Sequence, residues 1–346
     1  MRRLPIYFLI DISESMVGDP IGQVEAGMAE IVKELRTDPY ALETVYISII
    51  VFAGRAQKIS PLVELSNFYP PKLPVGGGTS LGNAMNFLMN DIDVTVKKTT
   101  LEEKGDWKPI IFLFTDGNPT DYVDDAFQRW NNKYRNSTSL ITVSIGNNID
   151  TKILGRITDN VLRLNKTDDN SFKAFFRWIT ASIKTSSISV SELNTDELKL
   201  ASYDDILTKI ELEMSVPEII DENFAVMLGK CQKTQRPYLL KYYKPTSTNP
   251  YGYNRSTGFQ LVGAYPVDNT YFELTDGQPL GSTVNTRDLV GFPNCPCCGN
   301  QYGFSVCRCG RIMCVGDEEQ SECPWCGWQA HFGFAEGDSD ISRTRG

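Results

Sequence analysis

The first residues of this chain place an acid and two hydroxyls directly after a short apolar run. The run from Ile6 to Ile10 has the length of a buried strand in a parallel sheet rather than of a helix. Asp11, Ser13 and Ser15 follow it. Open α/β sheets bind ligands at the carboxyl ends of their strands. Carboxylate and hydroxyl oxygens suit Mg²⁺, Mn²⁺ or Ca²⁺, so the sequence predicts a site for such an ion at this edge.

Two later segments belong to the same pattern. A glycine run over 76–78 leads to Thr79 at the start of a helix-patterned stretch, and the apolar run 109–114 ends in Thr115 and Asp116. Each places a further oxygen ligand at the expected edge of the sheet. The alternative is that these residues only cap turns and helices. A phosphate-binding loop is disfavoured because no Gly-Lys-Ser/Thr closes the glycine run.

Strand and helix patterns alternate over the first half of the chain. This alternation predicts an α/β fold with a doubly wound, mainly parallel sheet that is covered on both faces. We expect amphipathic helices over 19–36, 80–91, 121–134 and 171–184. We expect further strands over 44–52, 139–145 and 161–164.

The second half of the chain changes character. Residues 187–204 are rich in Ser, Asn, Thr and Asp and are interpreted as a linker between a first domain, 1–186, and a second, 205–336. The second domain is predicted to be small and rich in β-structure, with strands that include 238–244, 259–264 and 270–274. The polar tail 337–346 is predicted to be disordered.

Eight of the nine cysteines lie between residues 295 and 326, and the single histidine follows them. Tight Cys-x-x-Cys-Gly turns aim two thiolates at one metal ion, and structural zinc takes four such ligands. The number of candidates predicts two zinc ions. Our preferred first set is Cys295, Cys298, Cys323 and Cys326. Our preferred second set is Cys307, Cys309, Cys314 and His331. Spacing does not decide this division, and the two sets could interleave.

The remaining cysteines and the other chemistries are judged by context. Cys297 is left over by this division, and the isolated Cys231 is interpreted as a buried apolar side chain. A disulfide framework would require an oxidising compartment, which nothing in the sequence indicates. Catalytic zinc would keep a water position and a nearby general base, and neither is needed to explain so many thiols. We therefore predict structural zinc.

Composition limits the class of protein. With 346 residues the chain can form two or three domains, and a formal net charge of −9 disfavours general binding to nucleic acids or anionic membranes. No apolar run approaches the length of a membrane helix. Arg2 and Arg3 before an apolar stretch imitate a signal peptide, but Asp11 interrupts the stretch and no cleavage motif follows. We expect a cytoplasmic protein.

The hydroxyl and acid pattern resembles the metal-ion-dependent adhesion site (MIDAS) of von Willebrand factor A domains over roughly residues 1–186. The resemblance implies that Ser13, Ser15 and Thr79 ligate an Mg²⁺ ion directly or nearly so. It implies that Asp11 and Asp116 hold the ion largely through water. The remaining coordination position would accept a carboxylate of a partner protein.

Together with the cysteine-rich module, the chain resembles the TerY-type proteins of bacterial tellurite-resistance and stress-response systems. That resemblance implies a non-enzymatic adaptor or phosphorylation target that acts with a protein kinase and a PP2C-type phosphatase. Phosphorylation is expected at a hydroxyl on the rim of the metal site, with Thr79, Ser80 and Thr115 as candidates. The alternatives are an accessory protein of an AAA-type ATPase and a metal-dependent hydrolase, which would need a general base beside the metal.

Overall fold

The structure is a computed structural model, and it describes residues 2–145, 151–164, 169–188, 207–209, 224–244, 258–276, 282–316, 320–331 and 338–344. Contacts within the chain define two units. The N-terminal unit comprises Met1–Ile12, Asp19–Pro74 and Thr79–Ile219. The C-terminal unit comprises Ser13–Gly18, Val75–Gly78 and Ile220–Gly346.

The N-terminal unit is built on a seven-stranded sheet in the order β3-β2-β1-β4-β5-β6-β7. Pairing from β2 to β6 is parallel, and the two edge strands pair antiparallel to their neighbours. The strands are β1 (Leu4–Asp11), β2 (Val45–Phe52), β3 (Ala56–Glu64), β4 (Ile110–Thr115), β5 (Ser139–Ile145), β6 (Val161–Leu164) and β7 (Leu207–Lys209). This order confirms the predicted doubly wound, mainly parallel sheet.

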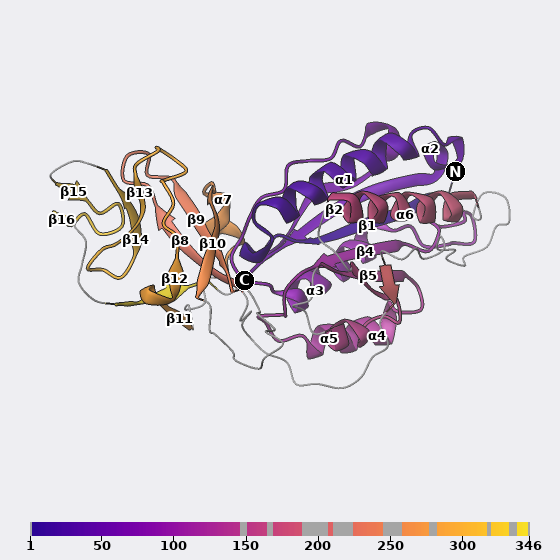
Figure 1. Cartoon of the computed structure of the whole chain (residues 1–346). Coiled ribbons are helices and arrows are strands. Elements are labelled where there is room, and N and C mark those ends of the chain that lie inside the picture. Colours follow the sequence, from indigo (N-terminus) through magenta and orange to yellow (C-terminus); the bar gives the residue numbers. More distant parts are fainter. Residues whose placement is uncertain are drawn as a thin grey trace, which may run out of the picture. The chain divides into compact units, whose positions relative to one another are not determined.

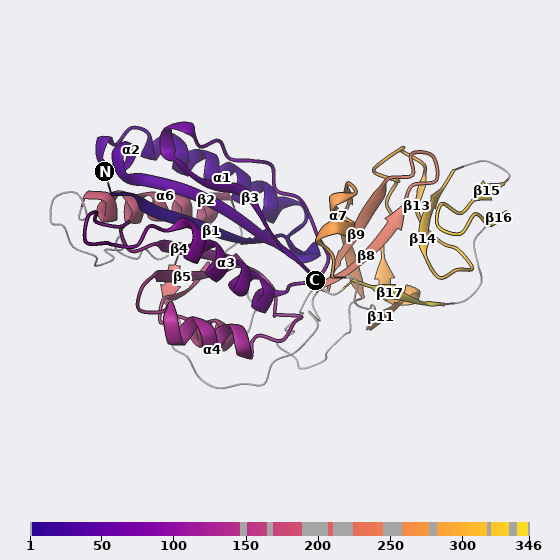
Figure 2. The same cartoon turned by 180° about the vertical axis from the view of Figure 1, so that it is seen from behind.

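Helices cover both faces of this sheet, with α1, α2 and α6 on one side and α3, α4 and α5 on the other (Figures 1 and 2). Their bounds are α1 (Asp19–Leu35), α2 (Pro39–Thr44), α3 (Leu81–Thr95), α4 (Asp124–Lys133), α5 (Thr151–Gly155) and α6 (Asp169–Ile188). Short 3₁₀ turns span Glu14–Met16, Leu65–Asn67 and Thr286–Asp288. No helix among the described residues combines the length and the apolar character that crossing a membrane requires.

Alternate residues of β1 serve the two faces of the sheet, because successive side chains of a strand point in opposite directions. Tyr7 and Leu9 join the core beneath α3 and α4. Phe8 stacks on Phe112 of β4 with ring centroids 5.7 Å apart. All eight residues of β1 are buried. This explains why the strand reads as a continuous apolar run that ends abruptly at the acid.

The C-terminal unit contains a six-stranded sheet in the order β12-β10-β9-β8-β14-β13 and two two-stranded sheets, β11-β17 and β15-β16. The main strands are β8 (Phe224–Lys230), β9 (Pro237–Tyr243), β10 (Phe259–Pro266), β12 (Leu289–Val290), β13 (Tyr302–Val306) and β14 (Ile312–Val315). The shorter sheets use β11 (Ser282–Asn285), β15 (Ser321–Glu322), β16 (Gln329–Ala330) and β17 (Asp340–Arg343). This confirms a second unit rich in β-structure.

Two details of the predicted domain plan differ from the structure. The second domain is predicted to begin at residue 205, but β7 pairs with β6 in the first sheet. The tail 337–346 is predicted to be disordered, but β17 pairs with β11 and buries Ile341. An apolar residue that fits the core outweighs the polarity of its neighbours here. The proposed linker lies outside the described residues from 189 to 204.

The expected strand over 270–274 is instead a short helix, α7 (Thr270–Leu274). The Asp268 carboxylate accepts a hydrogen bond of 2.9 Å from the Thr270 backbone N–H, which favours a helical turn. Tyr271 and Leu274 are buried at helical spacing, whereas Phe272 is exposed. The aromatic residues that suggested a strand therefore follow a helical period.

Candidate functional site: a sheet edge of oxygen ligands and two cysteine groups

The carboxyl ends of β1 and β4 carry the acids predicted from the sequence. These strands pair in parallel with Ile10 opposite Phe114, so Asp11 and Thr115 end side by side. The Thr115 hydroxyl donates a hydrogen bond of 2.7 Å to Asp11 Oδ2. Asp11 is fully buried and Asp116 is nearly so. The fold thus brings two carboxylates to adjacent strand ends, as the pattern predicted.

Thr79 lies beside the loop that follows β4. A Cβ atom built on Gly117 would stand 3.5 Å from Thr79 Oγ1, which is ordinary van der Waals contact. Thr79 itself is buried and comes two residues before the start of α3. The hydroxyl therefore belongs to the same edge of the sheet as Asp116 and Thr115.

Ser13 and Ser15 fall in the C-terminal unit by their contacts. Their Oγ atoms are 3.1 Å apart, close to the separation of about 3.0 Å between neighbouring oxygen ligands of an octahedral ion with bonds of about 2.1 Å. Between them, the buried Glu14 carboxylate accepts hydrogen bonds from the Gly78 N–H and the Tyr271 hydroxyl. The two serines are thus held as a pair, as shared ligation would require.

The residues at this edge suit a hard divalent cation. The Asp11 carboxylate is buried and receives a hydrogen bond from a neutral hydroxyl, so a bound cation would offset the cost of burying its charge. Every donor named in the pattern is oxygen, which is the chemistry that Mg²⁺, Mn²⁺ and Ca²⁺ prefer. The same burial argues against the expected phosphorylation sites. Thr79, Ser80 and Thr115 are each at most 3 % exposed, out of reach of a kinase without local opening.

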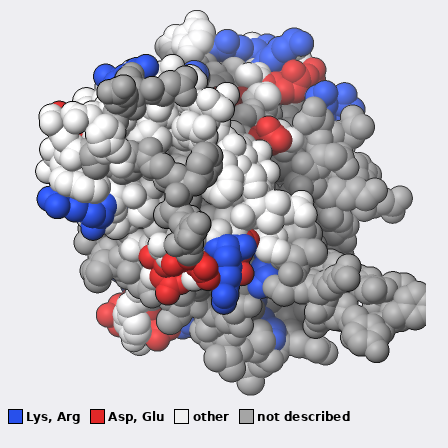
Figure 3. Space-filling view, turned by 60° about the vertical axis from the view of Figure 1, so that its left-hand side comes forward, with Lys and Arg blue, Asp and Glu red and all other residues white. Residues whose placement is uncertain are grey.

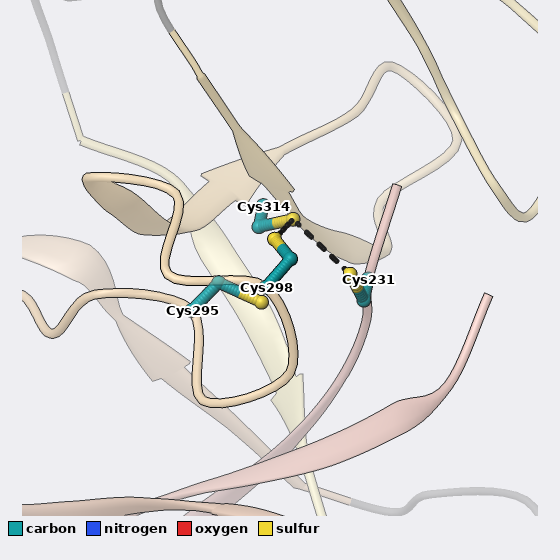
Figure 4. A group of neighbouring side chains, drawn as sticks. All are labelled: Cys231, Cys295, Cys298 and Cys314. Carbon is teal, nitrogen blue, oxygen red and sulfur yellow. Dashed lines mark hydrogen bonds between the residues drawn. The ribbon is translucent and has the colours of Figure 1, made fainter. Parts of the chain in front are cut away.

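Eight of the nine cysteines form two groups of four. The first group is Cys231, Cys295, Cys298 and Cys314, and the second is Cys307, Cys309, Cys323 and Cys326. The side chains of the first group, which includes the unexpected Cys231, point toward one another from separate stretches of the C-terminal unit (Figure 4). Within each group the sulfur atoms all lie within 4.8 Å of one another. Each group could hold a metal ion.

The sulfur separations match tetrahedral coordination. Cys314 Sγ lies 3.8 Å from Cys298 Sγ and 3.9 Å from Cys231 Sγ. In the second group Cys307 Sγ lies 3.7 Å from Cys326 Sγ, and Cys309 Sγ lies 3.9 Å from Cys323 Sγ. Zinc–sulfur bonds of about 2.3 Å in a tetrahedron separate the sulfur atoms by about 3.8 Å. Both groups therefore have the dimensions of a structural zinc site.

This grouping corrects the predicted division of the ligands. Cys295 and Cys298 do not share a group with Cys323 and Cys326. His331 is exposed and belongs to neither group of the described residues. Its place is taken by Cys231, which sequence context alone indicates to be an apolar core residue. Cys297 stays outside both groups, and its sulfur lies 3.9 Å from the Pro237 carbonyl oxygen.

A shared backbone turn explains why the sequence does not reveal Cys231 as a ligand. The N–H groups of Gly299 and Gly327 donate to the carbonyl oxygens of Cys295 and Cys323, and both glycines have positive φ. Gln235 makes the same bond to Cys231, at 3.0 Å, with φ of 59°. The turn at Cys231 therefore has the backbone of a zinc knuckle, the tight Cys-x-x-Cys-Gly turn that presents two thiolates to one metal ion. It lacks the second cysteine and the glycine by which a knuckle is identified in a sequence. The only available signal is a cysteine among polar turn residues.

The pKa values of the thiols differ within each group. A hydrogen bond from Cys314 lowers the pKa of Cys295 to about 5 and raises the pKa of Cys314 well above its usual value. Burial raises the pKa of Cys298 to about 11. In the second group the Trp328 N–H lowers the pKa of Cys326, while burial raises that of Cys307 to about 12. A metal ion binds thiolates, so its binding to either group releases protons from the thiols.

Charged side chains of both signs lie on the described surface of the chain. On the face shown in Figure 3, acidic and basic side chains are interspersed over the described part of the surface. They form no continuous basic field there.

Comparison with protein families agrees with both halves of the structure. A model of the von Willebrand factor type A domain matches residues 6–177, and a model of the TerY-C metal binding domain matches residues 221–346. This chain has the TerY-type architecture. Its N-terminal unit is accordingly described below as the von Willebrand A domain, and its cysteine groups lie in the TerY-C domain. The predicted fold class and family resemblance are confirmed.

Solved structures resemble the chain only remotely. Proximal thread matrix protein 1 from the mussel byssus is 15% identical over 54% of this chain and 46% of its own, with a TM-score of 0.37. The pilus adhesin SpaC from Lactobacillus rhamnosus GG is 12% identical over 54% of this chain and 30% of its own, with a TM-score of 0.43. The ArnB paralog VWA2 from Sulfolobus acidocaldarius is 11% identical over 78% and 65%, with a TM-score of 0.39. The chain spans less than half of the mussel and pilus proteins.

Proposed function

We propose that this TerY-type chain is a non-enzymatic, metal-dependent adaptor that binds other proteins in a bacterial tellurite-resistance and stress-response phosphorylation system. Its partners in this proposal are a protein kinase and a PP2C-type phosphatase. It would act in the cytoplasm, where reducing conditions keep thiols available for zinc. The observation that carries the proposal is the pair of buried acids at adjacent strand ends, Asp11 and Asp116, with Thr79 beside them.

The oxygen ligands support binding rather than turnover. An Mg²⁺ ion held by Ser13, Ser15 and Thr79, with Asp11 and Asp116 linked through water, would keep an electrophilic position. A carboxylate or phosphoryl oxygen of a partner protein could occupy that position. In this proposal the side chains of the chain orient the ion, and the partner supplies the last ligand. A single exchangeable ligand gives an interaction that can be switched.

The cysteine groups support a structural role for zinc in the TerY-C domain. Four thiolates fill a tetrahedral ion and leave no open position for a reacting water. Catalysis would need that position and a general base beside it. We therefore assign two zinc ions to the integrity of the C-terminal unit and the oxygen-lined edge to partner binding.

A pull-down from native lysate in Mg²⁺ buffer tests the proposal. The full chain serves as bait beside D11A and T79A variants and an N-terminal-unit control, D38A, which removes a helix cap at α2. Wild type and D38A are expected to retain a kinase or phosphatase that both site variants lose. Recovery of the same partners by all four baits would contradict a metal-dependent adaptor. Recovery of an AAA-type ATPase in their place would favour the accessory-protein alternative.

A further inference from the structure

Two loops of the von Willebrand A domain are joined directly at the predicted ion site. The Thr79 N–H donates to the Thr120 hydroxyl at 2.9 Å, and the Thr120 N–H donates to the Thr79 carbonyl oxygen at 2.9 Å. Thr79 belongs to the glycine-rich loop and Thr120 to the loop after β4 that also carries Asp116. This reciprocal pair fixes the backbone of one loop against the other at the position of the candidate ligand.

Asp121 adds a second link between the same loops. Its Oδ1 accepts a hydrogen bond of 3.1 Å from the Gly82 N–H, and its Oδ2 accepts one of 2.8 Å from the Asn83 N–H. These donors belong to the first turn of α3, where N–H groups lack partners within the helix. Ser80, at the N-cap position, makes no side-chain capping bond. Asp121 therefore caps α3 from a separate loop, and its charge suits the positive end of the helix.

Close packing leaves little freedom at this junction. A Cβ atom on Gly82 would stand 2.6 Å from the Tyr122 carbonyl oxygen and 3.0 Å from Asp121 Oδ2. Only glycine lets the helix start approach the loop so closely. The start of α3, and with it the Thr79 hydroxyl, is thus held in one position relative to the loop of Asp116.

We propose that Asp121, assisted by Thr120, is a positioning residue of the ion site. It acts through Thr79: by anchoring the start of α3, it holds the Thr79 hydroxyl at a fixed distance from Asp116. The inference rests on the proposed function, because it requires that an ion bind at this edge. Outer groups that orient metal ligands typically change metal affinity by about 10- to 100-fold when removed. Asp121 belongs to that class, although the pattern that predicted the ion site does not include it.

The test is a Mn²⁺ titration of the zinc-loaded full chain, with free Mn²⁺ followed by electron paramagnetic resonance. D121A is expected to weaken Mn²⁺ binding about 10-fold. D121N keeps one carbonyl acceptor and is expected to lose less affinity than D121A. T120V, which removes the acceptor of the Thr79 N–H, is expected to weaken binding several-fold. Equal losses in D121N and D121A would mean that charge rather than position matters, and would overturn the inference.

Asp38 supplies the matched control. Its carboxylate caps α2 through the Tyr40 and Ala41 N–H groups at 2.9 and 3.2 Å, so D38A removes an equivalent cap away from the ion site. D38A and D121A are expected to lower thermal stability similarly, and only D121A is expected to lower Mn²⁺ affinity. If D121A fails to fold, T120V and D121N carry the comparison.

The failure of the inference can be separated from failure of the proposed function. D116A defines the background, because it removes an acid that is predicted to hold the ion through water. If wild type binds Mn²⁺ above that background and D121A binds it equally, the positioning role is wrong and the ion site stands. If wild type binds no more Mn²⁺ than D116A, both the ion site and the positioning role are wrong.

Discussion

The proposed role of Cys231 as a zinc ligand depends on residues that are distant from it in the sequence. Cys231 stands alone at the end of β8, yet its sulfur lies 3.9 Å from that of Cys314. Its thiol also accepts a hydrogen bond of 3.3 Å from the Thr234 N–H, as a thiolate ligand in a knuckle does. We infer that it completes the first zinc site in place of the expected histidine.

Zinc content tests this assignment. C231S is expected to bind one zinc ion fewer than wild type, because a closed structural site needs four ligands. C297S and H331A are expected to keep the wild-type content, since neither residue belongs to a group of sulfur atoms among the described residues. Zinc per chain would be measured by plasma mass spectrometry after gel filtration. A loss of zinc in H331A together with full content in C231S would contradict this assignment and favour His331 as the fourth ligand.

Gln235 offers a prediction about backbone strain. It is the only non-glycine residue with positive φ among those described, whereas the equivalent turns use glycine. The left-handed conformation costs an ordinary residue about 1–2 kcal/mol. Q235G is therefore expected to raise the free energy of unfolding of the zinc-loaded chain by about 0.5–1 kcal/mol, after the flexibility of glycine in the unfolded chain is counted. Denaturant titration would measure the change.

Gln232, in the same turn, provides the control for that substitution. Its φ is not positive, so Q232G adds flexibility without relieving strain and is expected to destabilise the chain. If the two glycine variants destabilise the chain equally, the strain assigned to Gln235 is absent.

At the scale of elements, α1 shows why periodicity predicts a helix but not its partner. The apolar spacing over 19–36 correctly indicates the helix. The packing of α1 on α6 depends on Gly27, because a Cβ atom there would stand only 2.0 Å from the Phe176 ring of α6. G27A is therefore expected to lower the free energy of unfolding by about 1–3 kcal/mol through overpacking.

The same helix contains the matched control. A Cβ atom added at Gly22 would meet nothing within 4 Å, and the residue is exposed. G22A is expected to raise the free energy of unfolding by about 0.5–1 kcal/mol, the gain in helix propensity. Thermal melts of both variants would check the pair, and a similar shift for both would show that α1 and α6 are not in such close contact.

Three of the strands that sequence analysis does not locate share one property. β3, β7 and β17 are edge or short strands with mixed polarity, so their patterns carry little signal. Each exists because a neighbouring strand offers unpaired backbone groups. By contrast, the buried central strands β1, β4 and β5 are predominantly apolar and are located correctly.

At the scale of the whole molecule, the two units should respond differently to metal removal. The cysteines of the two groups come from β14, from the end of β8 and from the turns around these strands. The free energy of zinc binding therefore contributes to the folding of the C-terminal unit. A strong zinc chelator in excess Mg²⁺ is expected to release two zinc ions and to expose residues 224–344 to protease. The N-terminal unit, whose core consists of apolar side chains, is expected to stay resistant.

Limited proteolysis with mass spectrometry would follow both regions during chelation. Restoring zinc should restore protection, which would exclude general damage by the chelator. Unchanged cleavage of residues 224–344 after complete loss of zinc would contradict a structural role for the metal.

The information that can be read from the linear chain of this protein is local. Periodicity defines the buried strands and amphipathic helices, and short motifs mark Asp11, Thr79, Asp116 and the knuckle beginning at Cys295, because each signal lies within a few residues. The folded arrangement was needed to show that Cys231 joins Cys314, that Cys307 and Cys309 face Cys323 and Cys326, and that Asp121 caps α3. These pairings depend on which strands and turns the fold places side by side, and a chain of residues carries no local record of that placement.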